Sequence, residues 1–354
     1  MTHLLNQNRT KVDDCQLSLT PPIIPSPFGK EQMANGKSEV GGPRIVFMGT
    51  PEFAVESLKV LVENNYNVVG VITMPDKPAG RGHKLQFSAV KQYAIENGLP
   101  VLQPEKLKDE VFLNQLKELK ADVQVVVAFR MLPEVVWNMP HLGTFNLHAS
   151  ILPQYRGAAP INHAIINGEK ETGATTFFLT HEIDTGKIIL QERIPIADAD
   201  NAGTIHDKLM VMGAKMVRET IDLLALGRID AVDQSQFLVN YSELKTAPKI
   251  FKETCEIDIT RSVEEVQNFV RGLSPHPTAW IEVQFPGQNE KTILKVFETE
   301  MEFVIHSEKP GTLITDGKKY IKIALRDGFI NLKVVQAPGK KRMETEEMLR
   351  GMRL

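Results

Sequence analysis

Two polar side chains end a short apolar segment in the middle of the chain, Thr144-Phe145-Asn146-Leu147-His148. Side chains alternate across a β-strand, so a strand here would place Asn146 and His148 on one face and Phe145 and Leu147 on the other. Asn offers a neutral donor that can stabilise an oxyanion, and His can transfer a proton near neutral pH. From these residues alone, an active site and an ordinary solvent-facing strand end are equally well supported.

The next segment, residues 150–160, has the sequence Ser-Ile-Leu-Pro-Gln-Tyr-Arg-Gly-Ala-Ala-Pro. It is rich in small residues and prolines, holds one Arg, and leads into a helix expected to start near Pro160. Such a loop is rigid and can bring its backbone close to a ligand, although a plain strand-to-helix connection is the simpler alternative.

A single Asp184-Thr185-Gly186 follows between two expected strands. The tripeptide is first of all a turn signal. Aspartic proteases also use Asp-Thr-Gly, but they need two such aspartates that share a proton, which disfavours that interpretation here. A carboxylate that orients His148 is the more attractive hypothesis, although the sequence does not show that the two residues meet.

The expected turn after the first strand, Gly49-Thr50-Pro51-Glu52, bears on cofactor binding. Pro51 and Glu52 break the Gly-x-Gly-x-x-Gly fingerprint, and Glu52 would repel a pyrophosphate. We therefore predict that the chain does not bind NAD. No His or Cys cluster has metal-ligand spacing, so we expect no metal cofactor.

Nearly all-apolar segments alternate with amphipathic segments through the first half of the chain. Strands are expected at 45–48, 68–72, 123–128 and 144–148, and helices at 52–63, 88–97 and 109–119. This alternation predicts a parallel sheet covered on both faces, in a doubly wound, Rossmann-like α/β domain. Asn146 and His148 then fall at the carboxyl end of a strand, where open α/β sheets hold ligands. Strands at 175–179 and 187–194 and a helix at 203–227 complete the domain.

The pattern changes from Phe251 onward. A short helix at 262–271 precedes several short strand-like segments separated by turns, which predicts a small, OB-like β-barrel. The expected division is a flexible tail over 1–43, an α/β domain over 44–228, a linker over 229–250 and a C-terminal barrel over 251–354.

Composition limits the setting in which the protein works. It has only two cysteines, Cys15 and Cys255, so a reducing compartment is the simpler interpretation. No apolar run approaches the roughly 18 residues that span a bilayer, and the N-terminus lacks the pattern of a signal peptide. We therefore expect a cytoplasmic protein without membrane contact.

The formal net charge of -3 argues neither for nor against an anionic partner. Residues 291–343, however, hold 11 Lys and Arg against 6 Asp and Glu, a net of +5 that is densest at Lys340-Lys341-Arg342. From the residues alone, a solvated charged face is the simpler explanation.

Taken together, these motifs resemble the methionyl-tRNA formyltransferases over residues 44–350. Asn146-x-His148, the loop from Ser150 to Ile161 and Asp184-Thr-Gly are similar to the 10-formyltetrahydrofolate-dependent transferases as a group. The features that narrow the match to the tRNA enzymes are the segments 47–53 (Phe-Met-Gly-Thr-Pro-Glu-Phe), 76–82 (Asp-Lys-Pro-Ala-Gly-Arg-Gly), 271–280 and 339–343.

The resemblance implies that 10-formyltetrahydrofolate donates a formyl group to the α-amino group of methionine on initiator tRNA. It also implies that Asn146 and protonated His148 stabilise the oxyanion, and that Asp184 orients His148 and assists proton transfer. By the same resemblance, the folate site would be lined by Ser150, Ile151, Leu152 and Pro153, the methionine pocket by Phe53, and the tRNA contacts would include Arg81, Lys84, Lys340, Lys341 and Arg342. We expect the protein to act as a monomer.

Two departures from the family pattern concern the shape of the folate pocket. Phe129-Arg130 stands where many members carry Tyr-Gly, and His163 replaces a frequent larger aromatic residue. The rival functions are formylation of an amino sugar or of a nucleotide amine, and nucleic-acid binding by an inactive enzyme scaffold. Intact Asn146, His148 and Asp184 argue against the last.

Overall fold

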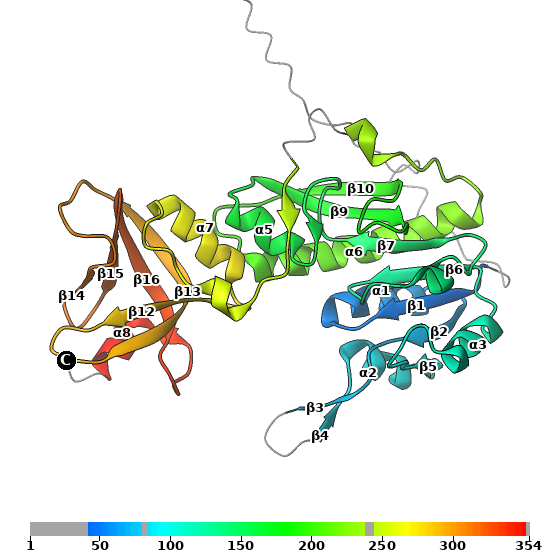
Figure 1. Cartoon of the computed structure of the whole chain (residues 1–354), viewed down its shortest axis with the longest axis horizontal. Helices are drawn as coiled ribbons and strands as arrows, with labels where there is room; N and C mark the ends of the chain where they lie inside the picture. The colour runs from blue at the N-terminus through cyan, green and yellow to red at the C-terminus, as the bar shows by residue number, and fades with distance from the viewer. Residues whose placement is uncertain (1–41, 80–83, 238–243, 352–354) are drawn as a thin grey trace, which may run out of the picture.

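A computed structural model describes residues 42–79, 84–237 and 244–351 (Figure 1). The N-terminal part is built on a seven-stranded sheet. In spatial order its strands are β10 (Ile188–Pro195), β9 (Glu171–Phe178), β7 (Thr144–His148), β6 (Val123–Val127), β1 (Ile45–Gly49), β2 (Val68–Ile72) and β5 (Val101–Leu102). The strands from β7 to β5 run parallel, and the order of the chain reverses between β1 and β6.

Helices cover both faces of this sheet because its strands are apolar on both faces. On one face, α1 (Glu52–Glu63), α2 (Ala89–Glu96) and α6 (Ala202–Ala225) pack on side chains such as Phe47 and Phe145. On the other face, α3 (Glu110–Glu118) and α4 (Glu134–Trp137) pack on Met48 and Val126. The predicted Rossmann-like domain is therefore confirmed.

Two features of the sheet differ from a fully parallel one. Strands β9 and β10 form an antiparallel extension beside β7. In addition, the polar loop after β2 forms a hairpin of β3 (Lys77–Ala79) and β4 (Lys84–Gln86). Short elements such as β5 and α4 escaped prediction because two to four residues are too few to show a period.

The segment predicted to be a linker makes regular contacts with the N-terminal domain. Val232 forms a β-bridge with Ile188. The 3-10 helix η2 (Gln234–Phe237) follows, and β11 (Thr246–Ala247) pairs with β8 (Arg156–Gly157). The segment therefore touches the loop that follows β7.

The C-terminal part is an antiparallel sheet packed on α7 (Val263–Leu273) and α8 (Thr345–Arg350). Its strands are β12 (Ala279–Gln284), β13 (Lys291–Phe303), β16 (Gly328–Gln336), β15 (Ile321–Leu325) and β14 (Leu313–Thr315), with β17 (Met343–Glu344) paired to β16. The predicted β-barrel is present as a curled half-barrel, whose edge strands are β12 and β14.

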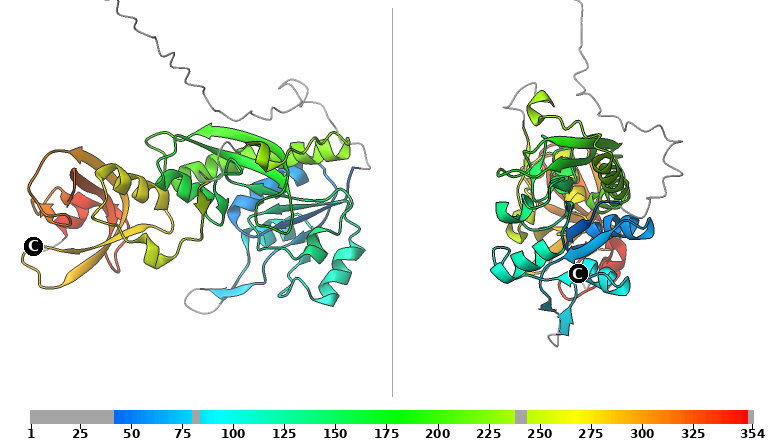
Figure 2. Two further views of the ribbon diagram at one scale, coloured as in Figure 1. Left: turned by 45° about the horizontal axis from the view of Figure 1, so that its top comes forward. Right: turned by 90° about the vertical axis from the view of Figure 1, so that its right-hand side faces the viewer.

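Helices α5 (Pro160–Ile166) and α7 join the two parts, which lie at opposite ends of the molecule (Figures 1 and 2). Asn162 Nδ2 donates to Gly272 O at 2.7 Å. Arg271 Nη1 donates to the carbonyls of Ala197, Asp198 and Asp200 at 2.8–3.0 Å. The contact is thus held by an apolar helix pair and by hydrogen bonds to backbone carbonyls.

Among the described residues, no helix is both long and apolar enough to cross a membrane.

Candidate functional site

Phe145 and Leu147 of β7 enter the core on the α6 side, so Asn146 and His148 project from the opposite face of the strand. The His148 side chain is only 7% exposed. Its Nε2 lies 2.9 Å from the carbonyl oxygen of Tyr155. Because a carbonyl oxygen can only accept, Nε2 carries a proton, which leaves Nδ1 as the nitrogen available for chemistry.

Asp184 lies on the Nδ1 side of this imidazole. Its Oδ2 is 3.8 Å from His148 Nδ1, and the carboxylate is 14% exposed. The same oxygen accepts a hydrogen bond from the Gly157 backbone N–H at 2.9 Å. The structure thus brings Asp184 to His148, which the sequence alone could not do.

The path of the β9–β10 loop explains how Asp184 reaches this position. Strand β9 ends beside the amino end of β7, where Phe178 pairs with Phe145 and Leu179 N donates to Thr144 O at 2.9 Å. The loop must therefore fold back along the sheet to approach His148. Gly186 permits this path, because a Cβ there would lie 1.6 Å from the Phe178 carbonyl oxygen.

The loop after β7 is fixed by hydrogen bonds from buried side chains of the antiparallel extension. Thr175 Oγ1 donates to Ser150 O at 2.7 Å, and Gln191 Nε2 donates to Leu152 O at 2.9 Å. The side chains of Ser150, Leu152 and Pro153 are themselves buried, and that of Ile151 is half-buried. Of the residues predicted to line the folate site, Ile151 therefore offers a side chain, and the others offer mainly backbone.

Gly157 connects this loop to the segment predicted as a linker. Its φ of +127° favours glycine, and a Cβ at this position would lie 2.4 Å from Ala247 O. Strand β11 can approach only because the side chain is absent. The Gly157 N–H is thereby directed at Asp184, a role that the sequence analysis missed.

Residues 181–183, which directly precede Asp184, contact α4. His181 Nε2 lies 3.5 Å from Glu134 Oε1, and its ring meets Trp137 edge-on at 5.4 Å. Nearby along the chain, Met131 and Ile183 are large apolar residues with more than half of their surface exposed. Single residues of this kind carry no periodic signal in the sequence.

The two departures from the family pattern anchor the backbone. The Arg130 guanidinium donates to the carbonyls of Pro104 and Glu105, and partial burial lowers its pKa. His163 Nε2 lies 3.0 Å from the carbonyl oxygen of Pro248, a residue just before the C-terminal domain.

Of the predicted substrate-binding residues of the N-terminal domain, Phe53 and Lys84 lie in described elements, α1 and β4. Phe53 is buried, with its ring 5.2 Å from that of His206. Arg81 lies outside the described residues. Lys84 belongs to β4, in the hairpin whose base is fixed by hydrogen bonds from Lys91 and Gln103 to Asp76.

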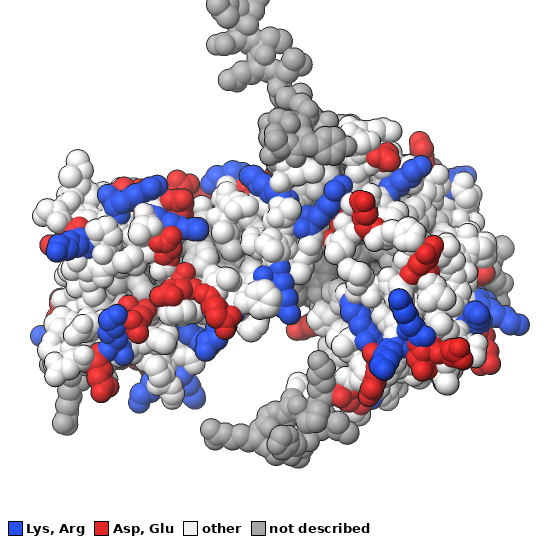
Figure 3. Space-filling model, viewed as in Figure 1, with Lys and Arg blue, Asp and Glu red and all other residues white. Residues whose placement is uncertain are grey.

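The C-terminal basic cluster is partly neutralised by neighbouring carboxylates. Arg342 Nη2 lies 2.7 Å from Glu298 Oε1, with its guanidinium 4.5 Å from the Phe297 ring centre. Other ion pairs of this domain are Lys333–Glu300, Lys322–Glu302, Lys291–Glu282 and Arg326–Glu265. Figure 3 shows basic and acidic side chains interspersed over this domain. Lys340 and Lys341 are exposed and form no ion pair with any described residue.

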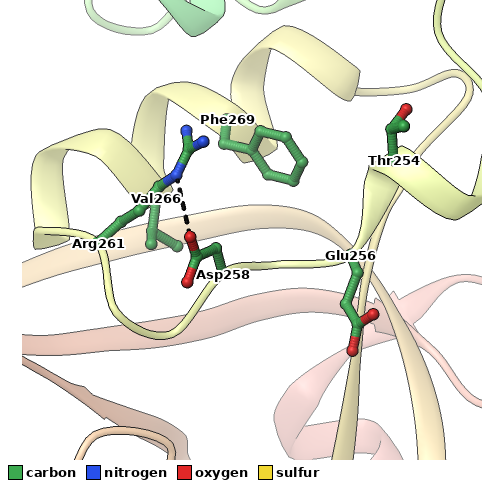
Figure 4. Close-up of a pocket in the computed structure, with 6 residues that line it drawn as sticks. All are labelled: Thr254, Glu256, Asp258, Arg261, Val266 and Phe269. Carbon is green, nitrogen blue, oxygen red and sulfur yellow. Dashed lines mark ion pairs between the residues drawn. The ribbon is translucent and has the colours of Figure 1, made fainter.

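A small hollow in the C-terminal domain lies between the segment after η4 (Lys252–Cys255) and α7 (Figure 4). Asp258 and Arg261 in its wall pair with each other at 3.5 Å, and Phe269 and Val266 supply apolar surface. None of the predicted site residues lines it. Within the described ranges, no group of three or more His, Cys, Asp or Glu side chains could hold a metal ion.

Comparison with known proteins places this geometry in a family. The model described as formyl transferase matches residues 43–221, and that of the formyl transferase C-terminal domain matches residues 249–353. The methionyl-tRNA formyltransferase of Bacteroides thetaiotaomicron is 63% identical over 311 residues, which cover 88% of this chain and 96% of the relative. The chain belongs to the methionyl-tRNA formyltransferase family. Another relative of that name, from Flavobacterium johnsoniae, is 54% identical over 87% of this chain and 96% of its own.

Solved structures show that the fold of this family is shared more widely. An N-formyltransferase from Helicobacter canadensis, in complex with folinic acid and dTDP-3-aminofucose, is 21% identical over 83% of this chain and 98% of its own, with a TM-score of 0.61. HypX from Aquifex aeolicus in complex with tetrahydrofolic acid covers 87% of this chain and 47% of its own at 18% identity, with a TM-score of 0.56. Both likenesses concern the fold alone.

Proposed function

We propose that this protein transfers a formyl group from 10-formyltetrahydrofolate to the α-amino group of methionine on initiator tRNA, for translation initiation. The observation that carries the proposal is the identity of 63% to a methionyl-tRNA formyltransferase along 96% of that relative's length. Both matched regions, 43–221 and 249–353, are required for that coverage. Folate is the expected donor because fold relatives bind folinic acid and tetrahydrofolic acid.

The proposed reaction begins when the methionine nitrogen attacks the formyl carbon of the donor. A C–N bond forms, and the carbonyl oxygen becomes a tetrahedral oxyanion. The Asn146 side chain forms no hydrogen bond with any described residue, so its N–H groups are free to donate to this oxygen. His148, protonated at Nδ1, donates from the other side. Preorganised donors of this kind stabilise developing charge strongly because they need no reorganisation.

Collapse of the intermediate moves one proton from the attacking nitrogen to N10 of the folate, as the C–N10 bond breaks. Asp184 and His148 are the groups placed to carry it, with Nδ1 and Oδ2 at 3.8 Å. The Tyr155 carbonyl keeps the ring in one orientation, because it holds Nε2 at 2.9 Å.

The remaining predicted residues are assigned to the two substrates. The loop of Ser150, Ile151, Leu152 and Pro153 lines the folate site, largely through backbone groups. Phe53 contributes to the methionine pocket through the rim of its largely buried ring. The tRNA phosphates are contacted by Arg81, by Lys84 of β4, and by Lys340, Lys341 and Arg342 of the C-terminal domain.

A formyl-transfer assay with competing acceptors tests this function. The purified protein, with 10-formyltetrahydrofolate, is given methionyl initiator tRNA, the same tRNA without methionine, a dTDP-amino sugar and glycinamide ribonucleotide. We expect formyl transfer to the methionyl tRNA alone. Transfer to the sugar or to the ribonucleotide, with none to methionyl tRNA, would contradict the proposal and support formylation of an amino sugar or a nucleotide amine instead.

A further inference from the structure

Gln234 is a buried polar side chain in the segment between the two domains. It lies in η2 and is 3% exposed. Its Nε2 donates to Asp184 O at 2.9 Å and to Gly186 O at 2.8 Å. Its Oε1 accepts from Arg156 Nη2 at 2.6 Å and from Arg156 Nε at 3.2 Å.

These contacts fix both ends of the amide. Two carbonyl oxygens require a donor, whereas a guanidinium requires an acceptor, so only one orientation of the amide satisfies all three groups. A glutamate could serve Arg156 but not the carbonyls, and a leucine could serve neither. A buried network satisfied in this way specifies one geometry, because any other leaves a polar group unpaired.

The groups that Gln234 holds belong to the two segments that meet at the proposed catalytic pair. Asp184 has a φ of +54°, a conformation that a non-glycine residue keeps only when its surroundings impose it. Arg156 directly precedes Gly157, whose N–H binds the Asp184 carboxylate at 2.9 Å. Gln234 thus bonds directly to the backbone of Asp184. It also bonds to Arg156, the neighbour of Gly157, whose N–H binds the Asp184 carboxylate.

We propose that Gln234 is a positioning residue for formyl transfer, which sets the approach of Asp184 to His148 without touching either substrate. The inference rests on the proposed function, because its effect is expressed through that reaction. It also gives the segment predicted as a linker a part in assembling the site. Loss of the amide would release the Asp184 loop from Arg156 while leaving Asn146 and the β7 backbone in place.

The test compares Gln234→Leu and Gln234→Glu with Gln124→Leu. Gln124 is an equally buried glutamine that accepts one hydrogen bond, from Thr144 at 3.0 Å, and lies toward the amino end of β6, away from the site. For both Gln234 variants we expect kcat for methionyl-tRNA formylation to fall by about 10²-fold, the effect of a small misplacement of catalytic groups, with KM for both substrates little changed. For Gln124→Leu we expect the kcat of the wild type.

A second background separates positioning from a general loss of stability. Because Gln234 acts through Asp184, Gln234→Leu should lower kcat little further in the Asp184→Ala background, whereas a general loss of stability would lower kcat by the same factor in both backgrounds. Gln124→Leu should keep the wild-type kcat whatever its melting temperature.

A wild-type kcat in a folded Gln234→Leu protein would overturn the inference, as would an equal loss of kcat in Gln124→Leu or an undiminished loss in the Asp184→Ala background. Should the leucine variant fail to fold, Gln234→Glu, which keeps the contact with Arg156, is judged by the same criteria. An inactive wild-type protein would instead contradict the proposed function.

Discussion

The carboxyl end of β7 and the charged face of the C-terminal sheet use opposite charges in different ways. At β7, His148 and Asp184 are almost enclosed, and backbone groups hold both side chains, through the Tyr155 carbonyl and the Gly157 N–H. On the C-terminal sheet, Arg342 and Glu298 pair at 2.7 Å with about half of each side chain exposed. Only the first arrangement has its geometry imposed by the rest of the fold.

The physical difference lies in what surrounds the charges. Water screens an exposed pair, which contributes roughly 0–1 kcal/mol to stability. A buried polar group that loses its partner costs about 1–3 kcal/mol, so its neighbours are strongly constrained. The β7 site can therefore hold a reactive geometry, while the C-terminal sheet can exchange its ion pairs for phosphate contacts at little cost.

The largest effect is expected from His148→Ala. Removal of a positioned proton-transfer group should lower kcat for formyl transfer by about 10²–10⁴-fold. The matched control is His141→Ala, because this histidine is 69% exposed and lies 3.6 Å from Asp122, away from the site. Full activity in the His148 variant would exclude this residue from the mechanism. The enclosed site would then matter no more for catalysis than the exposed C-terminal face.

A buried carboxylate outside the site tests the energetic side of the comparison. Burial opposes ionisation of Asp200, but hydrogen bonds from Lys208, Ala197 N and Thr204 together hold its pKa below the usual value. Asp200→Asn should therefore cost about 1–3 kcal/mol of unfolding free energy at pH 7. Glu298→Gln, at an exposed pair, should cost no more than about 1 kcal/mol.

The pH dependence of the Asp200 variant has a definite sign. A carboxyl group with a lowered folded-state pKa stabilises the protein above its unfolded pKa, and this contribution is lost as pH falls through the folded pKa. The deficit of Asp200→Asn, measured by urea unfolding, should thus be full at neutral pH and shrink in acid. Equal losses of unfolding free energy in the Asp200 and Glu298 variants at pH 7 would contradict the expected difference between buried and exposed carboxylates.

The smallest effect concerns the tRNA contacts proposed for Lys340, Lys341 and Arg342. Lys340 and Lys341 have no ion-pair partner among the described residues, whereas Arg342 must leave Glu298 before it can bind phosphate. Lys341→Ala should therefore flatten the salt dependence of tRNA binding more than Arg342→Ala does, although each variant removes one charge. Filter binding over a range of salt concentrations measures the slopes. A greater flattening of the salt dependence in Arg342→Ala would show that its pairing with Glu298 does not matter.

The sequence could predict what depends on local pattern. Phe145 and Leu147 must be buried, which places Asn146 and His148 on the opposite face of β7. The approach of Asp184 could not be predicted, because it depends on an antiparallel extension and a loop that folds back. The role of Gln234 could not be predicted, because an isolated glutamine in an aperiodic segment belongs to no pattern that indicates a function. The composition gives the number of C-terminal charges but could not show that Glu298, in β13, pairs with Arg342.

The central claim is that His148 and Asp184 act as one unit. Its most direct test is kcat for formyl transfer to methionyl initiator tRNA in His148→Ala, Asp184→Ala and the double variant. When two residues act as a unit, loss of either one removes most of their joint effect. The kcat of the double variant should therefore be within about tenfold of that of the slower single variant. A loss equal to the product of the two single losses would contradict the account, because it would show that the two groups act independently.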